Sequence, residues 1–109
     1  MAQGRVPGLT GGPVWGQASD DLNATLLAWP AGEGPAEHVN EERDVLVFVA
    51  DGSLTVVVDE ATHELGRADA LIVPKGRRRR LTAGPDGVRY LSVHLRRPPL
   101  QIKSASQRA

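Results

Sequence analysis

The amino-acid sequence predicts a single small all-β domain built as a sandwich or a barrel. Three observations point to this fold class. The chain of 109 residues has the size of one domain. Short apolar segments alternate with turn signals at close spacing, which is typical of sandwiches and barrels. No window of useful length has apolar residues at helical spacing, and no repeat indicates a solenoid or a propeller.

Turn residues divide the chain into its expected elements. Residues 1–21 begin with a stretch rich in Gly and Pro and are expected to form a flexible arm. Residues 22–102 are expected to form the barrel, and residues 103–109 a mobile tail. Within the barrel we expect strands at residues 23–29, 44–50, 54–58, 62–65, 70–73 and 88–95, with a short strand at 100–102 as a further possibility.

The strand expected at residues 44–50 carries information about burial. Residues 44–50 are almost continuously apolar, which favours a strand buried on both faces, and Asp51-Gly52 indicates a hairpin turn after it. A second turn is indicated at 85–87, and residues 77–82 alternate too weakly to assign.

The strand at 88–95 alternates clearly, so its two faces can be compared. Burial of the three aliphatic residues Leu91, Val93 and Leu95 is worth several kcal/mol, so we expect that face to be the core. The other face carries Val88, Tyr90, Ser92 and His94, and this assignment places His94 outside the barrel. If that face is turned inward instead, it completes a polar pocket with His38.

The composition limits the core and the partners. Hydrophobic residues make up 40% of the chain and aromatic residues only 4%, so Val, Leu, Ile and Ala must build the core. The 13 basic and 13 acidic residues balance, which argues against nucleic acid or an anionic membrane as partner. Cysteine is absent, so disulfides, thiolate metal sites and thiol nucleophiles are excluded. No signal-peptide core or spanning apolar stretch is evident, and we expect a cytoplasmic protein.

The spacing of several turn residues resembles the two motifs of the cupins, G-x5-H-x-H-x3/4-E-x6-G and G-x5-P-x-G-x2-H-x3-N. Gly32 is followed at the family spacing by His38, Asn40 and Gly52, and the second motif is matched by Asp69, Pro74 and Gly76. The resemblance covers about residues 22–95. It implies a cupin-type double-stranded β-helix, that is, a jelly-roll barrel.

The resemblance also implies where a metal would bind in such a barrel, because metal-binding cupins use two His, one Glu and a third His. His38 stands at the first of these positions. Asn40 offers only a neutral amide oxygen at the second, and Val45 stands at the acid position. Arg79, a permanent cation that cannot coordinate a metal, stands at the third His position. One strong ligand of four is left, so no metal cofactor is expected.

An alternative keeps a divalent metal (Fe, Mn, Zn or Ni) and an enzyme of dioxygenase or isomerase type. If a bulge turned the strand by one residue, Asp44 would take the acid position. His38, Asp44 and His94 would then be the ligands. A further alternative is a metal-free isomerase or cyclase with His38 as its base, because a neutral imidazole can accept a proton.

The favoured interpretation is a barrel that binds a small polar or anionic molecule at a degenerate metal site. Its pocket would consist of His38, Asn40 and Arg79 against Val45 and Val47. Arg79 could hold a carboxylate or phosphate through two parallel hydrogen bonds. A purely structural role for Arg79 would be an internal ion pair with an acid such as Glu42 or Asp44. The arginine run 77–80 lacks interleaved aromatic residues, which argues against a nucleic-acid surface.

We expect a homodimer. Small barrels expose sheet edges that soluble proteins must cover. Val14 and Trp15 have little local structure to bury them, and residues 22–29 carry apolar side chains on both faces. Cupins often pack sheets across a two-fold axis, and the resemblance implies the same assembly here. The alternative is that the arm folds back over its own barrel.

Overall fold

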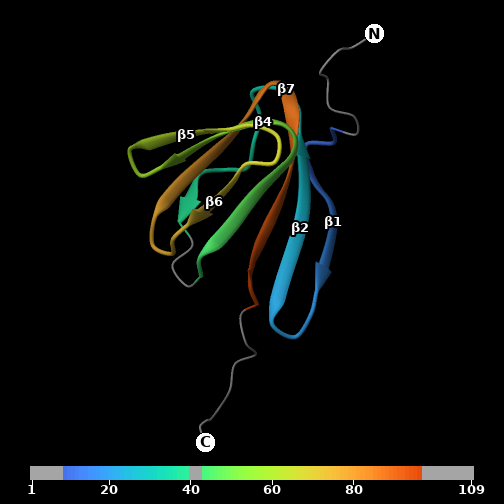
Figure 1. Cartoon of the computed structure of the whole chain (residues 1–109), viewed down its shortest axis with the longest axis vertical. Coiled ribbons are helices and arrows are strands. Elements are labelled where there is room, and N and C mark those ends of the chain that lie inside the picture. The colour runs from blue at the N-terminus through green and yellow to red at the C-terminus, as the bar shows by residue number, and fades with distance from the viewer. Residues whose placement is uncertain (1–8, 40–42, 97–109) are drawn as a thin grey trace, which may run out of the picture.

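A computed structural model describes residues 9–39 and 43–96, with only the backbone given at residues 38 and 39. These residues form strands and contain no helix, so none of them forms a helix that could cross a membrane. The strands, shown in Figure 1, are β1 (Gly12–Ala18), β2 (Leu22–Trp29), β3 (His38–Val39), β4 (Val45–Val58), β5 (Ala61–Leu65), β6 (Ala70–Val73) and β7 (Arg78–Leu95).

The two long strands, β4 and β7, organise the fold. They pair with each other along most of their length, and every pairing in the sheet is antiparallel. The sheet order is β1-β2-β7-β4-β5, with β3 added to β7 and β6 added to β4. The register of the β4–β7 pair shifts between Val49 and Asp51 and again between Gly52 and Leu54.

These shifts divide β4 and β7 into halves that belong to two facing layers (Figure 1). The first layer contains β1, β2 and β6 together with residues 45–49 of β4 and 90–95 of β7. The second layer contains β3 and β5 with residues 54–58 of β4 and 79–83 of β7. The expected all-β barrel is therefore confirmed.

Two of the turns that the sequence predicts are absent from the structure. Neither Asp51-Gly52 nor residues 85–87 reverse the chain, since they lie within β4 and β7 at the point where these strands pass between layers. Gly52 and Gly87 nevertheless have φ of 80° and 87°, a conformation that residues with a side chain rarely adopt. The backbone does require glycine at these two positions, but the glycines mark bends within long strands rather than hairpin turns.

The N-terminal prediction is corrected as well. Residues 12–18, expected to belong to a flexible arm, form β1, and six of these seven residues pair with β2. An edge strand can accept Gly and Pro where a bulge interrupts the ladder, and the register of β1 shifts between Pro13 and Trp15. Residues 1–8, 100–102 and 103–109, including the possible last strand and the tail, lie outside the described residues.

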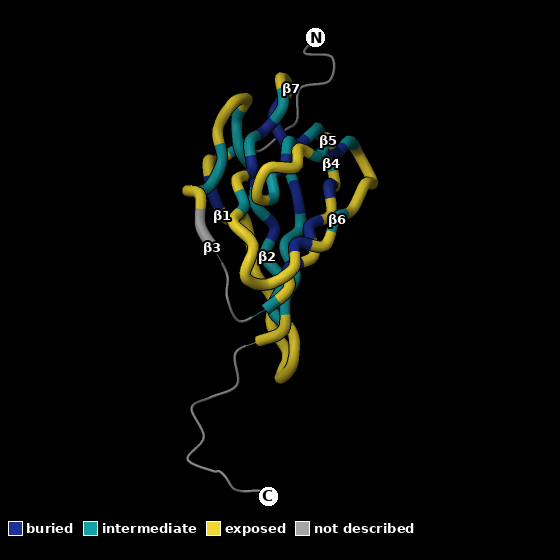
Figure 2. Tube along the Cα trace, turned by 90° about the vertical axis from the view of Figure 1, so that its left-hand side faces the viewer, coloured by how far each residue is buried: buried dark blue, intermediate teal, exposed yellow. Residues whose placement is uncertain are grey.

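The core lies between the two layers, where Figure 2 shows the buried segments enclosed by exposed turns. Along β4 the inward residues Val45, Val47 and Val49 are at most 1% exposed. Leu46 and Phe48, which alternate with them, are 38% and 37% exposed. The expectation that residues 44–50 are buried on both faces is therefore wrong, because within the described chain no layer covers the outer face of β4.

The loop before β3 is held against β7 at very close range. Gly32 N donates to Ala83 O at 3.0 Å, and Ala83 N donates to Glu33 O at 2.8 Å. A Cβ atom on the neighbouring Gly34 would overlap the backbone carbonyl of Leu81. Only glycine fits at this crossing.

We therefore expect Gly34→Ala to lower the free energy of unfolding by about 1–3 kcal/mol, because backbone atoms must move to admit the methyl group. Urea denaturation of the variant and the wild type would measure this change. Gly16→Ala is the matched control, since its Cβ would lie 3.5 Å from Ala24 O, an ordinary contact. Equal stabilities for the two variants would contradict the close packing.

Candidate functional site

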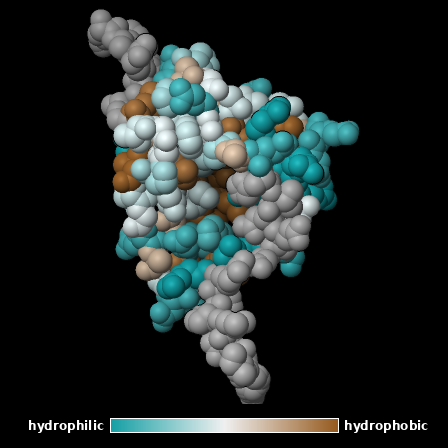
Figure 3. Space-filling model, turned by 180° about the vertical axis from the view of Figure 1, so that it is seen from behind, coloured by the Kyte–Doolittle hydropathy of each residue, from teal (hydrophilic) through white to brown (hydrophobic). Residues whose placement is uncertain are grey.

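A cavity of about 200 Å³ lies between the two layers. The surface is hollowed on the face shown in Figure 3, with hydrophobic residues at the bottom of the hollow. The lining combines one cationic residue, three residues with hydroxyl groups and five apolar residues, namely Arg79, Thr25, Ser92, Tyr90, Leu27, Pro35, Val45, Val47 and Leu81.

Strand alternation positions most of these side chains. Thr25 and Leu27 of β2 lie opposite Ser92 and Tyr90 of β7, so the four residues share one face of the first layer. Val47 pairs with Ser92 from the other side and continues this face onto β4. Leu81 and Arg79 come from the second layer, and the loop before β3 contributes Pro35.

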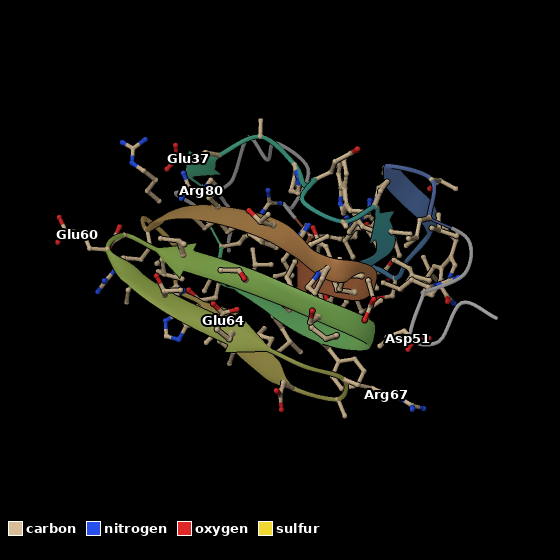
Figure 4. The ribbon with its side chains drawn as sticks, turned by 90° about the horizontal axis from the view of Figure 1, so that it is seen from above. Glu37, Asp51, Glu60, Glu64, Arg67 and Arg80 are labelled. Atoms are coloured by element: carbon tan, nitrogen blue, oxygen red, sulfur yellow. The ribbon has the colours of Figure 1, made fainter. Side chains whose placement is uncertain are left out.

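Arg79 is the only charged residue among the described residues of the lining. Its side chain is partly buried, and desolvation lowers the pKa of its guanidinium, an effect that Tyr90 opposes. A guanidinium stays charged at neutral pH even so. By contrast, Figure 4 shows the charged side chains of Glu60 and Arg67 projecting away from the ribbon beyond the two ends of β5. Arg79 is thus a cation held where small anions would be partly dehydrated.

Tyr90 is 3% exposed and stands beside Arg79 in the lining. Desolvation raises the pKa of its phenol to about 12, while Trp29 and Arg79 act in the opposite direction. The indole Nε1 of Trp29 is buried and has no hydrogen-bond partner in the described part of the chain, although it is close enough to Tyr90 to influence that pKa. At neutral pH the phenol is protonated and can donate a hydrogen bond.

The raised pKa gives a direct prediction, since Tyr90 is the single tyrosine of the chain. The tyrosinate absorbance of the folded protein should titrate near pH 12, against about 10 for the chain in denaturant. Because the folded-state pKa lies above the unfolded one, the associated stability is present below pH 10 and is lost as the pH rises toward 12. A folded-state midpoint near pH 10 would show that the phenol is exposed to water.

Three of the five predicted ligand-binding residues, Arg79, Val45 and Val47, line this one cavity. The backbone of His38 pairs with Arg79 in the β3–β7 ladder, so the first-motif histidine lies next to the cavity along the sheet. The direction of its side chain, and the whole of Asn40, fall outside what the structure describes. The binding roles of all five residues stay predictions, as does a catalytic role for His38.

His94 lies on the inward face of β7, on the same side as Tyr90 and Ser92, so the expectation that it lies outside is wrong. The opposite face turns outward instead, and its Leu95 is 61% exposed. Val47 and Val49 of β4 are buried and pair with Ser92 and Tyr90, so the register places this face of β7 inward. His94 nevertheless does not line the cavity. Its Nδ1 lies 2.9 Å from Leu95 O, and its Nε2 lies 3.4 Å from Asn23 Nδ2.

Asp44 points away from the cavity. Its side chain is exposed and Oδ1 accepts a hydrogen bond of 2.9 Å from Lys75 N. The β4–β6 register runs without a shift from Val45 to Phe48, so no bulge turns Asp44 inward. Val45 and Arg79, at two of the four cupin ligand positions, cannot coordinate a metal. No group of three His, Asp or Glu side chains that could hold a metal occurs in the described residues. The side chains that the structure describes at these positions therefore do not fit a metal.

Sequence reasoning had not singled out Thr25, Leu27, Pro35 or Leu81 as site residues, and it had placed Tyr90 and Ser92 on the less favoured face. The signal that was available was the alternation of residues 22–29 and 88–95. It specifies which residues share a face but not which face is inside.

Comparisons with known proteins agree with this architecture. Residues 25–94, more than half of the chain, match the family model of the cupin domain. No curated protein matches the chain.

Solved structures that resemble the chain include KdgF from Halomonas sp., with a TM-score of 0.69, 20% identity and 74% of each chain covered. The cupin domain of Cnp3 from Schizosaccharomyces pombe has a TM-score of 0.67 at 19% identity, covering 76% of this chain and 61% of that one. A cupin-superfamily sugar phosphate isomerase from Silicibacter pomeroyi has a TM-score of 0.62 at 24% identity, with 72% of this chain and 52% of that chain covered. At these identities the likeness concerns the fold.

Proposed function

Because the chain belongs to the cupin family, we propose that it is a cytoplasmic small-molecule-binding barrel that holds a small anion at Arg79. The observation that supports this most strongly is the charge of the cavity. Its described lining contains a partly buried guanidinium, that of Arg79, and such a group attracts a small anion. An arginine can bind a carboxylate or phosphate through two parallel hydrogen bonds.

Arg79 and Val45 do not suit the binding of a metal, but both suit the binding of an organic anion. A cation at one ligand position repels a metal, and a valine at another leaves an apolar wall. The same two residues suit an organic anion, whose charge meets the guanidinium and whose carbon atoms contact the valines. Binding at this site should accordingly require no metal.

Substitution of Arg79 tests the function. Isothermal titration of the wild type with acetate, butyrate, 3-hydroxybutyrate and inorganic phosphate should detect at least one ligand. Arg79→Gln should weaken its binding about 10- to 100-fold, the effect of losing charge-assisted hydrogen bonds. Arg80→Gln is the matched control, because Arg80 is exposed and pairs into the same ladder one position along.

Absence of binding to the wild type, or equal losses for the two variants, would contradict the role of Arg79. A second arm repeats the titration after treatment with a chelator and dialysis. Unchanged affinity is expected, whereas lost affinity that returns with Fe, Mn, Zn or Ni would favour the metal-dependent alternative.

We also propose that the chain forms a homodimer through the outer face of its first layer. Six large apolar side chains here are each more than a third exposed, namely Trp15, Leu22, Leu46, Phe48, Ile72 and Leu95. The register pairs Leu22 with Leu95 and Leu46 with Ile72, so four of these exposed apolar side chains are direct cross-strand neighbours. Such a surface is complementary to another apolar surface, and the same face of a second copy supplies one.

A further inference from the structure

Polar and apolar groups lie on different walls of the cavity. Thr25 and Ser92 are direct cross-strand partners on the first layer, so their hydroxyl groups lie close together. Val47 flanks Ser92 on the neighbouring strand, and Leu81 comes from the opposite layer. A ligand therefore meets a pair of hydroxyls on one side and hydrocarbon on the other.

Two further hydrogen-bond donors, Arg79 and Tyr90, line the same cavity. Both are donors at neutral pH. A carboxylate, which accepts several hydrogen bonds at once, fits this pair of donors.

The size of the cavity limits the ligand. About 200 Å³ corresponds to the volume of roughly seven water molecules in the liquid. This accommodates a molecule of roughly six to ten non-hydrogen atoms. A short-chain acid can be enclosed at this site, whereas a hexose phosphate would extend out of it into solvent.

We propose that the ligand is a short-chain hydroxy- or oxo-carboxylate. Its carboxylate binds Arg79 and Tyr90, its hydroxyl or oxo oxygen binds Thr25 and Ser92, and its carbon chain contacts Val47 and Leu81. This inference rests on the proposed function, the binding of a small anion by Arg79, and adds the chemical class of that anion.

Paired ligands and paired variants test the inference. The probes are 3-hydroxybutyrate (each enantiomer), butyrate and glucose 6-phosphate, titrated into the wild type, Ser92→Ala and Thr25→Val. One enantiomer of 3-hydroxybutyrate should bind the wild type about three- to tenfold more tightly than butyrate does. Either substitution should remove most of this difference, which a general loss of folding, weakening both acids equally, would not do. Glucose 6-phosphate should bind more weakly than either acid.

Different results would contradict the ligand class and the binding of an anion by Arg79. Equal affinities for butyrate and both hydroxy acids, or a hydroxyl preference that survives both substitutions, would overturn the ligand class and leave anion binding at Arg79 intact. Tighter binding of glucose 6-phosphate through Arg79 would do the same. Failure of all these anions to bind the wild type, or affinities for them that Arg79→Gln leaves unchanged, would overturn both.

Discussion

Leu54→Ala should lower the free energy of unfolding by about 2–5 kcal/mol. Leu54 is 1% exposed and directly follows the register shift at which β4 enters the second layer. It lies opposite Leu65 of β5 and Ala83 of β7, so it joins three strands in the core. Removing its side chain leaves a cavity that the bent strands cannot easily close. Urea denaturation followed by circular dichroism would measure the loss.

Leu22→Ala is the matched control, because it removes the same atoms from a side chain that is 47% exposed. Its effect should be well below that of Leu54→Ala when both are measured at low protein concentration, where an effect on assembly contributes least. A similar loss at the two positions would mean that the core does not lie between the layers.

Phe48→Glu should convert the proposed dimer into monomers. Phe48 lies in the middle of the outer apolar face and is 37% exposed. A two-fold interface would contain the new carboxylate twice, and burying a charge without a partner is costly. We expect dimer affinity to fall at least about hundredfold. Light scattering at low micromolar concentration should give twice the 11.6 kDa chain mass for the wild type and about 11.6 kDa for the variant.

The control for this prediction is Thr62→Glu. Thr62 is exposed on β5 and pairs with Val57 on the second layer, away from the proposed interface. It adds the same charge, so the variant should stay dimeric. A monomeric wild type would contradict the dimer, and a dimeric Phe48→Glu variant would show that another surface joins the two copies.

The sequence alone predicted the fold because several of its signals are backbone requirements that depend on few neighbours. Gly32, Gly52 and Gly76 have φ of 77°, 80° and 81°, which glycine adopts without strain. Their spacing carried the resemblance to cupins, and the family match over residues 25–94 confirms it. The sequence also placed Arg79, Val45 and Val47 together, and all three line one cavity.

Where side chains point was decided by the tertiary structure. Alternation along residues 88–95 separated Tyr90 and Ser92 from Leu91 and Val93, but either set could have filled the core by its own composition. The valines of β4 occupy the interior and turn Tyr90 inward, which leaves Leu91 and Val93 on the outer face with Phe48.

Long-range pairing decided the remaining features. Residues 12–18 have little intrinsic tendency to form a strand, and β1 exists because β2 offers it a ladder of hydrogen bonds. The same pairing logic keeps Asp44 outside, since an unshifted β4–β6 register leaves no bulge to turn it. Local sequence therefore determined where the backbone could bend and which residues share a face. Only the packing of distant strands determined which face is buried, because that choice depends on the total apolar surface that both layers remove from water.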